Sequence, residues 1–374
     1  MKNILTLMNS FSVGGVTNVV FSFYNAIDKS EYKIDFIRDG IYEENNIEKN
    51  LKENGCKVYT FTKPKIGKIP FLNYKIQHRK IAKELLKKIG DKKYDAIHVH
   101  AYASVGIILA KALKIPVRIL HFHEAVTDFR NNANKSIITK IIWKNRQKEY
   151  NKWATVKAGD SLKACKVKYG EKVEFDNKLC IIYPPIDMQK FNPKNYSKQN
   201  AITNFSINED NLNIIHVGRL CSIKNQKFII EVIKELNQIK CTSLYLVGDG
   251  KRKQQLIDYA NELGVLDKIT FLPPNVSAEI YLAMDCSILP SFSEAFGMVA
   301  VESQLMGVRC FASTGVPKDV DIGACEFLDL SLGAKAWANA IINSKPVSIS
   351  QDKKSLFDIK EIIKRVQDLY QGKI

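Results

Sequence analysis

The sequence has no long apolar run, no closely spaced pair of cysteines and few histidines. No stretch approaches the ~18 uninterrupted apolar residues of a membrane span. The start, MKNILTLMNSF, is too short and too polar for a secretory signal peptide and is typical of a first strand. We therefore expect a cytoplasmic protein. The eight cysteines are scattered without a CxxC pair, which argues against structural zinc and against disulfides.

The length and composition indicate a globular protein of two domains. A chain of 374 residues exceeds the usual size of one domain, so each of two domains can bury its own core. Hydrophobic residues make up 45% of the chain and charged residues 25%, which is ordinary for a globular protein.

Positive charge is concentrated in the first half of the chain. The net charge is +17, and residues 1–200 carry 37 Lys and Arg against 19 Asp and Glu. Residues 201–374 carry 19 against 20. A basic region of this kind fits an anionic membrane surface, nucleic acid or a merely solvated lysine-rich face. We find no nucleic-acid-binding motif in the sequence, so charge alone leaves the partner open.

The first 27 residues predict a strand, a glycine-rich turn containing Gly14 and Gly15, and a helix. This is the opening unit of a doubly wound sheet, whose ligands lie outside the carboxyl ends of the strands. The turn is not a GxGxxG, because Asn18 occupies the place of the third glycine. The sequence therefore lacks the main feature that would predict a dinucleotide cofactor. The alternative for Gly14 and Gly15 is that they serve only to form the turn.

Alternating strand and helix patterns continue to about residue 182 and predict a parallel sheet. Two strand patterns end in His-x-His, at His98 and His100 and at His121 and His123. Each pair can point both imidazoles to one face. A metal site needs further ligands, and the sequence shows no Cys or carboxylate cluster beside them. Asp160 or Ser161 is expected to cap the next helix.

A second strand, loop and helix unit begins near Asn213. Arg219 and Lys224 lie in the loop between its strand and its helix. Two cations placed there can converge on a diphosphate, because Arg grips two oxygens and Lys adds a point charge. The alternative to a diphosphate site is that both basic residues are simply exposed to solvent.

The segment from Leu289 to Gly307, LPSFSEAFGMVAVESQLMG, predicts a strand end, a loop and a helix start. Glu294 lies on the loop and Glu302 about one turn inside the helix. Gly297 allows a ligand to come close. The backbone N–H groups of Gly297, Met298 and Val299, which follow Phe296, can receive phosphate or sugar oxygens.

Glu294 and Glu302, set in PSFSEAFGMVAVE, resemble the signature of the retaining nucleotide-sugar glycosyltransferases of family 4, which have the GT-B fold. The run GRLxxxKN at 218–225 resembles their donor-diphosphate site, and Gly14-Gly15 their N-terminal loop. The run from Ser313 to Asp319 is similar to the form of this segment found in enzymes of capsule and exopolysaccharide synthesis. In place of the family's usual Asn-Gly, this chain has Pro184-Pro185.

The resemblance implies roles for individual residues. Glu294 would hold hydroxyls of the donor sugar, Glu302 the ribose and His123 the far side of the sugar. Arg219 and Lys224 would stabilise the leaving diphosphate without an obligatory metal or cofactor. Donor contacts are expected from the two glycines and from Phe296 to Val299. His98, His100 and His121 are expected to be structural or to face the acceptor.

The fold implied is two facing Rossmann-like domains with a cleft between them. We expect an N-terminal acceptor domain at 1–190, joined by a returning C-terminal helix at 355–374, and a donor domain at 191–354. The polar run 195–210 is typical of a linker.

The implied reaction transfers a sugar, with retention of configuration, from a nucleotide-diphosphate donor, expected to be a UDP-sugar. The acceptor is a saccharide hydroxyl. The basic first domain favours a lipid-diphosphate-linked acceptor and peripheral contact with an anionic membrane. Three alternatives stay open: a GT-B epimerase, a phosphorylase, for which no cofactor lysine signature is found, and a basic nucleic-acid-binding protein.

Overall fold

The computed structural model describes residues 1–11, 15–40, 44–62, 70–123, 137–344 and 349–373. They form two compact units. Unit 1 comprises Met1–Pro185 and Ile359–Ile374, and unit 2 comprises Ile186–Asp358. The chain therefore leaves unit 1 directly after the Pro184-Pro185 pair and returns to it after Asp358. The limits expected from the sequence lie within five residues of these points.

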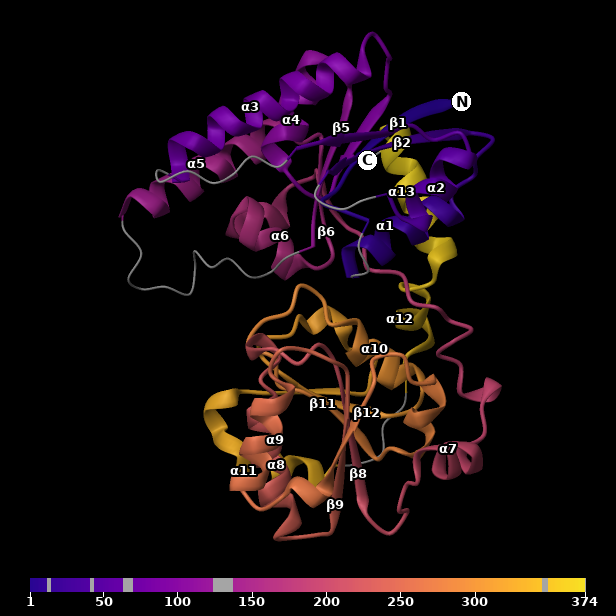
Figure 1. The fold of residues 1–374 in the computed structure, drawn as a ribbon, viewed down its shortest axis with the longest axis vertical. Helices are drawn as coiled ribbons and strands as arrows, with labels where there is room; N and C mark the ends of the chain where they lie inside the picture. The colour runs from indigo at the N-terminus through magenta and orange to yellow at the C-terminus, as the bar shows by residue number, and fades with distance from the viewer. Residues whose placement is uncertain (12–14, 41–43, 63–69, 124–136, 345–348, 374) are drawn as a thin grey trace. The chain divides into compact units, whose positions relative to one another are not determined.

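Unit 1 is a doubly wound α/β unit with a seven-stranded parallel sheet in the order β3-β2-β1-β4-β5-β6-β7 (Figure 1). Its elements are β1 (Lys2–Leu7), α1 (Gly15–Ala26), β2 (Tyr32–Asp39), α2 (Asn46–Glu53), β3 (Val58–Phe61), α3 (Pro70–Ile89), β4 (Ala96–Val99), α4 (Ala103–Ala112), β5 (Val117–Phe122), α5 (Ile137–Trp153), β6 (Val156–Gly159), α6 (Leu162–Tyr169), the 3₁₀ helix η1 (Glu171–Phe175), β7 (Leu179–Ile181) and α13 (Ile359–Gln371).

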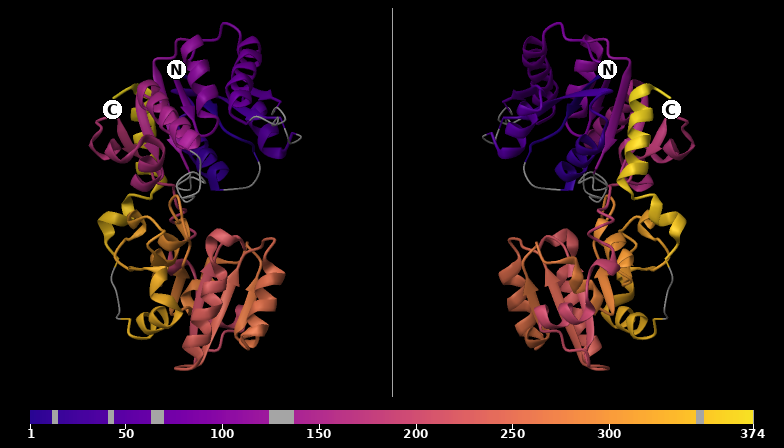
Figure 2. Two further views of the ribbon diagram at one scale, coloured as in Figure 1. Left: turned by 90° about the vertical axis from the view of Figure 1, so that its left-hand side faces the viewer. Right: turned by 90° about the vertical axis from the view of Figure 1, so that its right-hand side faces the viewer.

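The side chains of β1 alternate between two cores, one on each face of this sheet. Ile4 packs with residues of α1 and α13, whereas Leu5 and Leu7 pack with residues of α3 and α4. Helix α13 therefore completes the core of unit 1 although it comes from the end of the chain. Figure 2 shows it, in yellow, alongside unit 1 in both views.

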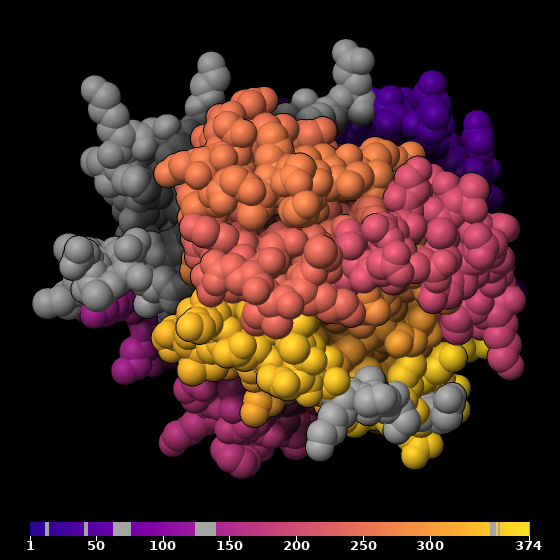
Figure 3. Space-filling model, turned by 90° about the horizontal axis from the view of Figure 1, so that it is seen from below, coloured from indigo at the N-terminus to yellow at the C-terminus, as the bar shows by residue number. Residues whose placement is uncertain are grey.

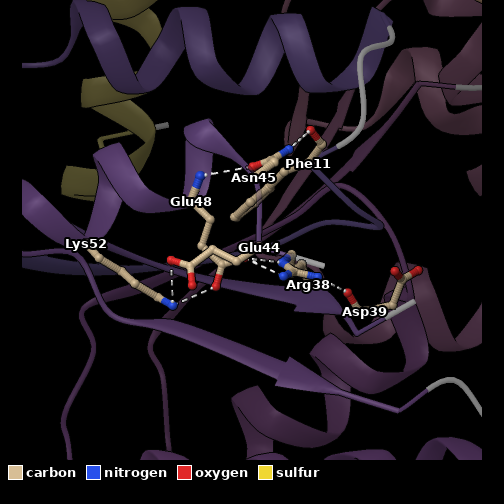
Figure 4. Close-up of polar contacts among 7 residues, drawn as sticks. All are labelled: Phe11, Arg38, Asp39, Glu44, Asn45, Glu48 and Lys52. Atoms are coloured by element: carbon tan, nitrogen blue, oxygen red, sulfur yellow. Dashed lines mark hydrogen bonds and ion pairs between the residues drawn. The ribbon is translucent and has the colours of Figure 1, made fainter. Parts of the chain in front are cut away.

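A buried ion pair fixes α2 against β2 (Figure 4). Nε of Arg38 donates to Oε2 of Glu48 at 2.7 Å, and Lys52 reaches the other carboxylate oxygen at 3.0 Å. Burial alone would raise the pKa of Glu48, but the hydrogen bonds from Lys52 and Arg38 lower it. Asn45 caps the helix by accepting from the Glu48 N–H at 3.1 Å, and it donates to the Phe11 carbonyl. The group joins β2, α2 and the segment after β1.

Unit 2 is a second doubly wound unit with a six-stranded parallel sheet in the order β10-β9-β8-β11-β12-β13. Its elements are η2 (Pro193–Asn195), α7 (Lys198–Phe205), β8 (Leu212–Val217), η3 (Ser222–Lys224), α8 (Gln226–Asn237), β9 (Thr242–Val247), α9 (Lys253–Glu262), η4 (Leu266–Lys268), β10 (Ile269–Leu272), η5 (Ala278–Ala283), β11 (Cys286–Leu289), α10 (Met298–Leu305), β12 (Arg309–Ser313), η6 (Lys318–Val320), β13 (Cys325–Leu328), η7 (Leu330–Leu332), α11 (Gly333–Ile342) and α12 (Gln351–Ser355).

The polar run 195–210 is not a plain linker, so that expectation is wrong. Ser197 caps α7 by accepting from the Asn200 N–H at 3.4 Å, and Ala201 is fully buried. α7 packs against η5, and Figure 3 shows it in pink beside the salmon residues of unit 2. A single buried alanine leaves almost no hydrophobic period, which is why composition alone missed the helix.

Across the part of the chain that the structure describes, no helix combines the length and the apolar character needed to cross a membrane.

Candidate functional site

Each sheet has one point at which the strand order reverses direction. In unit 1 it lies between β1 and β4, and in unit 2 between β8 and β11. Ligands of open α/β sheets bind outside the carboxyl ends of the strands at this point. Most candidate residues follow these four strands, and His123 follows β5, the neighbour of β4, so the topology gathers them at the carboxyl edges of the two sheets.

The loop after β8 is held close to the end of β9. The Leu220 N–H donates to the Asp249 carbonyl at 2.9 Å, and a Cβ on Gly248 would lie 2.1 Å from the Gly218 carbonyl oxygen. Gly248 also has a φ of +144°, which favours glycine. Arg219 is exposed on this loop, so its guanidinium is open to a ligand.

Two buried side chains, those of His216 and Gln226, hold the backbone of the same loop in place. Neutral His216, whose pKa burial lowers to about 4, lies with Nδ1 2.8 Å from the Ile288 carbonyl oxygen of β11. Its Nε2 lies 3.3 Å from the amide nitrogen of Gln226, which also donates to the Arg219 carbonyl at 2.9 Å. The Arg219 backbone is thereby tied to both central strands. Sequence reasoning did not identify Gln226, since a first-turn helix residue carries no obvious signal.

Lys224 and Glu294, predicted for different tasks, form an ion pair. Nζ of Lys224 lies 2.7 Å from Oε1 of Glu294, with 19% and 13% of the side chains exposed. The Phe292 N–H donates to the Ile223 carbonyl at 2.8 Å, which joins the two loops. One cation and one carboxylate thus meet at the switch point of unit 2, where the loop after β8 also carries the exposed Arg219. This arrangement suits an anion that also bears hydroxyl groups.

The helix after this loop begins as predicted. Gly297 has a φ of +105° and precedes the first helical residue, Met298. A Cβ on Gly297 would lie 3.3 Å from Val316 and 3.4 Å from Leu289, so the turn is tight. The N–H groups at the start of a helix, here those of Met298 and Val299, lack intrahelical partners and can receive anionic oxygens. Phe296 is buried and packs on Phe357 at 5.6 Å between ring centroids, so its ring supports the turn.

Glu302 lies in the second turn of α10 and is partly buried. Burial raises its pKa to about 7, although Lys190 and Lys224 oppose the shift. A carboxyl group with this pKa exchanges its proton near neutral pH. It therefore offers an acceptor whose strength depends on pH in that range.

In unit 1 the predicted Gly15 is the first residue of α1, and Gly14 lies outside the described residues. Among the described residues, no atom lies within 4 Å of the position that a Cβ on Gly15 would take. Local packing therefore does not require glycine at this position.

His123 belongs to a buried network that joins both His-x-His pairs. Nε2 of His123 lies 2.7 Å from Nδ1 of His100, and its Nδ1 lies 2.9 Å from Oδ1 of Asp160. His121 reaches the same oxygen through Nε2 at 3.1 Å, and its Nδ1 lies 3.1 Å from Nε2 of His98. Nδ1 of His98 lies 2.9 Å from the hydroxyl of Tyr370. The His123 side chain is only 2% exposed.

Asp160 is the carboxylate at the centre of this network. Burial alone would raise its pKa, but the neighbouring His123 and hydrogen bonds from both histidines lower it to about 2. The expectation that no carboxylate accompanies the histidines is therefore wrong. Ser161, not Asp160, caps α6 by accepting from the Ala164 N–H. Parallel pairing of β4, β5 and β6 places these residues side by side, and no local motif shows it.

Two groups in this network have metal-compatible geometry. The ligand atoms of His98, His100 and His121 lie within 4.8 Å of one another, as do those of His121, His123 and Asp160. Seven of the eight ring nitrogens already make hydrogen bonds within the network. A metal ion at either group would therefore have to replace several of these hydrogen bonds.

Comparisons with known families cover both units. The model described as "Glycosyltransferase Family 4" matches residues 13–190, and the model described as "Glycosyl transferases group 1" matches residues 197–320. The two matches adjoin and span most of the chain.

Among curated proteins, the chain is similar to D-inositol 3-phosphate glycosyltransferases. It is 29% identical to that of Mycobacterium ulcerans over 175 residues, 44% of this chain and 36% of the relative. It is 27% identical to that of Mycolicibacterium smegmatis over 189 residues, 47% of this chain and 42% of the relative. The matched part is thus less than half the length of these relatives.

Among solved structures, Anabaena HepE in complex with UDP-glucose superimposes with a TM-score of 0.73 at 16% identity, covering 100% of both chains. Sucrose-phosphate synthase from Thermosynechococcus elongatus gives 0.71 at 16% identity, covering 99% of this chain and 98% of that one. At this identity the likeness establishes the GT-B fold, as predicted. The two family models together show that the chain belongs to the group 1 glycosyltransferases of family 4.

Proposed function

We propose that the protein is a retaining glycosyltransferase that moves a sugar from a nucleotide-diphosphate donor to a hydroxyl of a saccharide acceptor. The observation that carries the proposal is the Lys224–Glu294 pair beside the exposed Arg219, at the switch point of unit 2 and next to the start of α10. A diphosphate needs cations and free N–H groups, and a sugar needs a carboxylate. The loops after β8 and β11 supply both.

In this proposal Arg219 and Lys224 stabilise the negative charge that grows on the leaving diphosphate. Cations placed in advance at a developing charge lower the barrier without reorganisation. No metal is required for this step, so we expect EDTA to leave turnover unchanged. Glu294 accepts hydrogen bonds from sugar hydroxyls and Glu302 from the ribose.

A UDP-sugar is the first donor to test, because HepE binds UDP and UDP-glucose. The test is release of nucleoside diphosphate from UDP-glucose, UDP-galactose, UDP-N-acetylglucosamine and GDP-mannose, with and without simple glycosides as acceptors. We expect release from one donor, stimulated by acceptor, and lost in Arg219→Ala. The anomeric configuration of the product, read by proton NMR, tests retention. Conversion of the donor sugar without acceptor would indicate an epimerase instead.

The acceptor is proposed to be lipid-diphosphate-linked, in the synthesis of a bacterial surface polysaccharide such as a capsule or exopolysaccharide. A groove of about 420 Å³ in unit 1 supports contact with an anionic membrane. Its lining combines the cations Arg79, Lys111 and Arg146 with apolar side chains from α4 and α5. Ile76 on α3 and Ile141 on α5 are 44% and 54% exposed. Basic residues around exposed isoleucines suit a surface of phosphates over acyl chains.

Flotation with phosphatidylglycerol vesicles at low salt tests this contact. We expect binding that weakens as salt is added and that falls in Ile141→Ser. Ile239→Ser is the matched control, because Ile239 is equally exposed at 55% but lies on the neutral unit 2. Absence of binding at low salt would favour a soluble acceptor, and salt-sensitive binding of oligonucleotides would favour the nucleic-acid alternative.

A further inference from the structure

The hydrogen bonds around Asp160 determine where each imidazole carries its proton. An ionised carboxylate only accepts, so His121 donates from Nε2 and His123 from Nδ1. Each neutral ring then has one lone pair left. Nδ1 of His121 accepts from Nε2–H of His98, whose Nδ1 accepts from the Tyr370 hydroxyl. Nε2 of His123 accepts from Nδ1–H of His100. With all four rings neutral, no other arrangement satisfies every contact.

This assignment leaves one nitrogen without a partner. Among the described residues, Nε2 of His100 is the one ring nitrogen of the four histidines that makes no hydrogen bond within the protein. Because His100 carries its proton on Nδ1 in this assignment, its Nε2 has a free lone pair and can only accept a hydrogen bond. Burial and the neighbouring histidines lower the pKa of His100 well below its usual value, so the ring stays neutral at physiological pH.

His100 also stands where a ligand is expected. It follows β4, and its backbone N–H donates to the Leu7 carbonyl at the end of β1 at 2.8 Å. β1 and β4 are the strands between which the order of the sheet reverses. The ring stacks near His98 and His123, with centroids at 4.0 and 5.0 Å, so its orientation is fixed. The switch point of unit 1 therefore presents a rigid, neutral hydrogen-bond acceptor.

We propose that Nε2 of His100 accepts a hydrogen bond from a hydroxyl of the saccharide substrate, and that His123 and Asp160 are positioning residues that keep this nitrogen unprotonated. The inference rests on the proposed function for the identity of the ligand as a saccharide. It changes the expected role of His123, whose two ring nitrogens are engaged by Asp160 and His100. The chemistry that favours a sugar is simple, since a neutral acceptor recognises a hydroxyl and offers nothing to a phosphate.

The first test reads the tautomers directly. Long-range proton–nitrogen NMR of histidine-labelled full-length protein at pH 8 is expected to show His100 protonated on Nδ1. In Asp160→Asn the amide competes for the same contacts, so His123 loses its fixed tautomer. We expect His100 to shift to the Nε2–H form. Tyr370→Phe is the control: it removes a hydroxyl from the other branch, so His100 should keep Nδ1–H. A wild-type protein with His100 protonated on Nε2 would overturn the proposal.

The second test measures function, with the donor that is turned over fastest among the four nucleotide sugars named above. His100→Ala is expected to lower kcat/KM about tenfold or more, as loss of a buried hydrogen bond does. UDP binding should stay within about twofold, because the diphosphate cations lie on unit 2. His100→Gln, whose carbonyl oxygen can stand near Nε2, should recover part of the loss.

The two hypotheses fail in different ways. Wild-type kcat/KM in His100→Ala, with normal UDP binding, would overturn the role of His100 and leave the proposed function intact. Absence of turnover of all four donors by the wild-type protein, together with absence of UDP binding, would overturn the proposed function whatever the NMR shows.

Discussion

At the scale of single residues, the proposed function makes the Lys224–Glu294 pair a balance between binding of the nucleotide and binding of the sugar. The carboxylate neutralises part of the charge that Lys224 can offer to a diphosphate. Replacing Glu294 by Gln should therefore tighten UDP binding by roughly threefold to tenfold, corresponding to about 1 kcal/mol for one nearby charge. The same change should weaken binding of a UDP-sugar relative to UDP, because a carboxylate acceptor for the sugar hydroxyls is lost.

Calorimetric titration measures both effects, and Glu279→Gln is the control. Glu279 is an acidic residue of unit 2 that contacts Asn204 on the surface and not Lys224. Unchanged or weaker UDP binding in Glu294→Gln would show that the pair does not restrain the lysine.

Glu302 predicts a pH-dependent stability. Its pKa in the folded protein, about 7, exceeds the ordinary value of 4.5, so the native state binds the proton more tightly than the unfolded state. This stabilisation is complete below pH 4.5 and is lost as the pH rises through 7. The unfolding free energy of the wild type should fall relative to Glu302→Gln between pH 5 and 8, by about 1–3 kcal/mol. Urea unfolding at several pH values measures it. Parallel curves would place Glu302 in a more hydrated environment.

The sequence grouped Arg219, Lys224 and Glu294 more readily than it grouped the residues of the histidine network. Arg219, Lys224 and Glu294 lie in short motifs directly after strands, so their spacing carries the signal. His100, His123 and Asp160 meet only because β4, β5 and β6 pair in order. That pairing is a tertiary property, and a lone aspartate before a helix is more simply taken as a cap.

At the scale of elements, the close approach of two loops depends on Gly248. A Cβ there would collide with the Gly218 carbonyl, and the φ of +144° is itself unfavourable for alanine. Gly248→Ala should cost more than about 2 kcal/mol and weaken UDP binding, since the Arg219 loop must move. Gly264→Ala is the control, with a φ of +70° and open space around its Cβ. It should cost about 1 kcal/mol and leave UDP binding unchanged. Equal effects of the two changes would contradict this account of the loop.

The alternation of strand and helix patterns predicted both parallel sheets, because each strand is a short apolar run between turns. α7 was missed for the opposite reason. Its eight residues are mostly polar, and its stability comes from the Ser197 cap and from packing of Ala201, which no hydrophobic period reveals. Elements held by capping and tertiary contact are the ones that pattern alone misses.

At the scale of the whole molecule, residues distant in sequence complete the core of unit 1. Leu369 of α13 is fully buried in a core that joins α13 to residues of the first 185. Leu369→Ala should destabilise unit 1 by about 2–5 kcal/mol. Limited proteolysis should then cut unit 1 first and leave unit 2, whose core is separate, resistant. Leu332→Ala, at a 56% exposed position of unit 2, should have no effect. Equal loss of protection in both units would show that the two cores unfold together.

The charge of the molecule follows the same division, with a basic first half and a neutral second half. In the proposed function, nucleotide recognition in the neutral unit therefore depends on a few placed cations and not on a general positive field. The most direct test is calorimetric titration of UDP and of uridine into the wild-type protein and into Arg219→Ala. We predict that UDP binds at least a hundredfold more tightly than uridine, and that most of this difference is lost in the variant. Equal binding of UDP and uridine, or undiminished UDP binding in Arg219→Ala, would contradict a diphosphate site at the ends of β8 and β11.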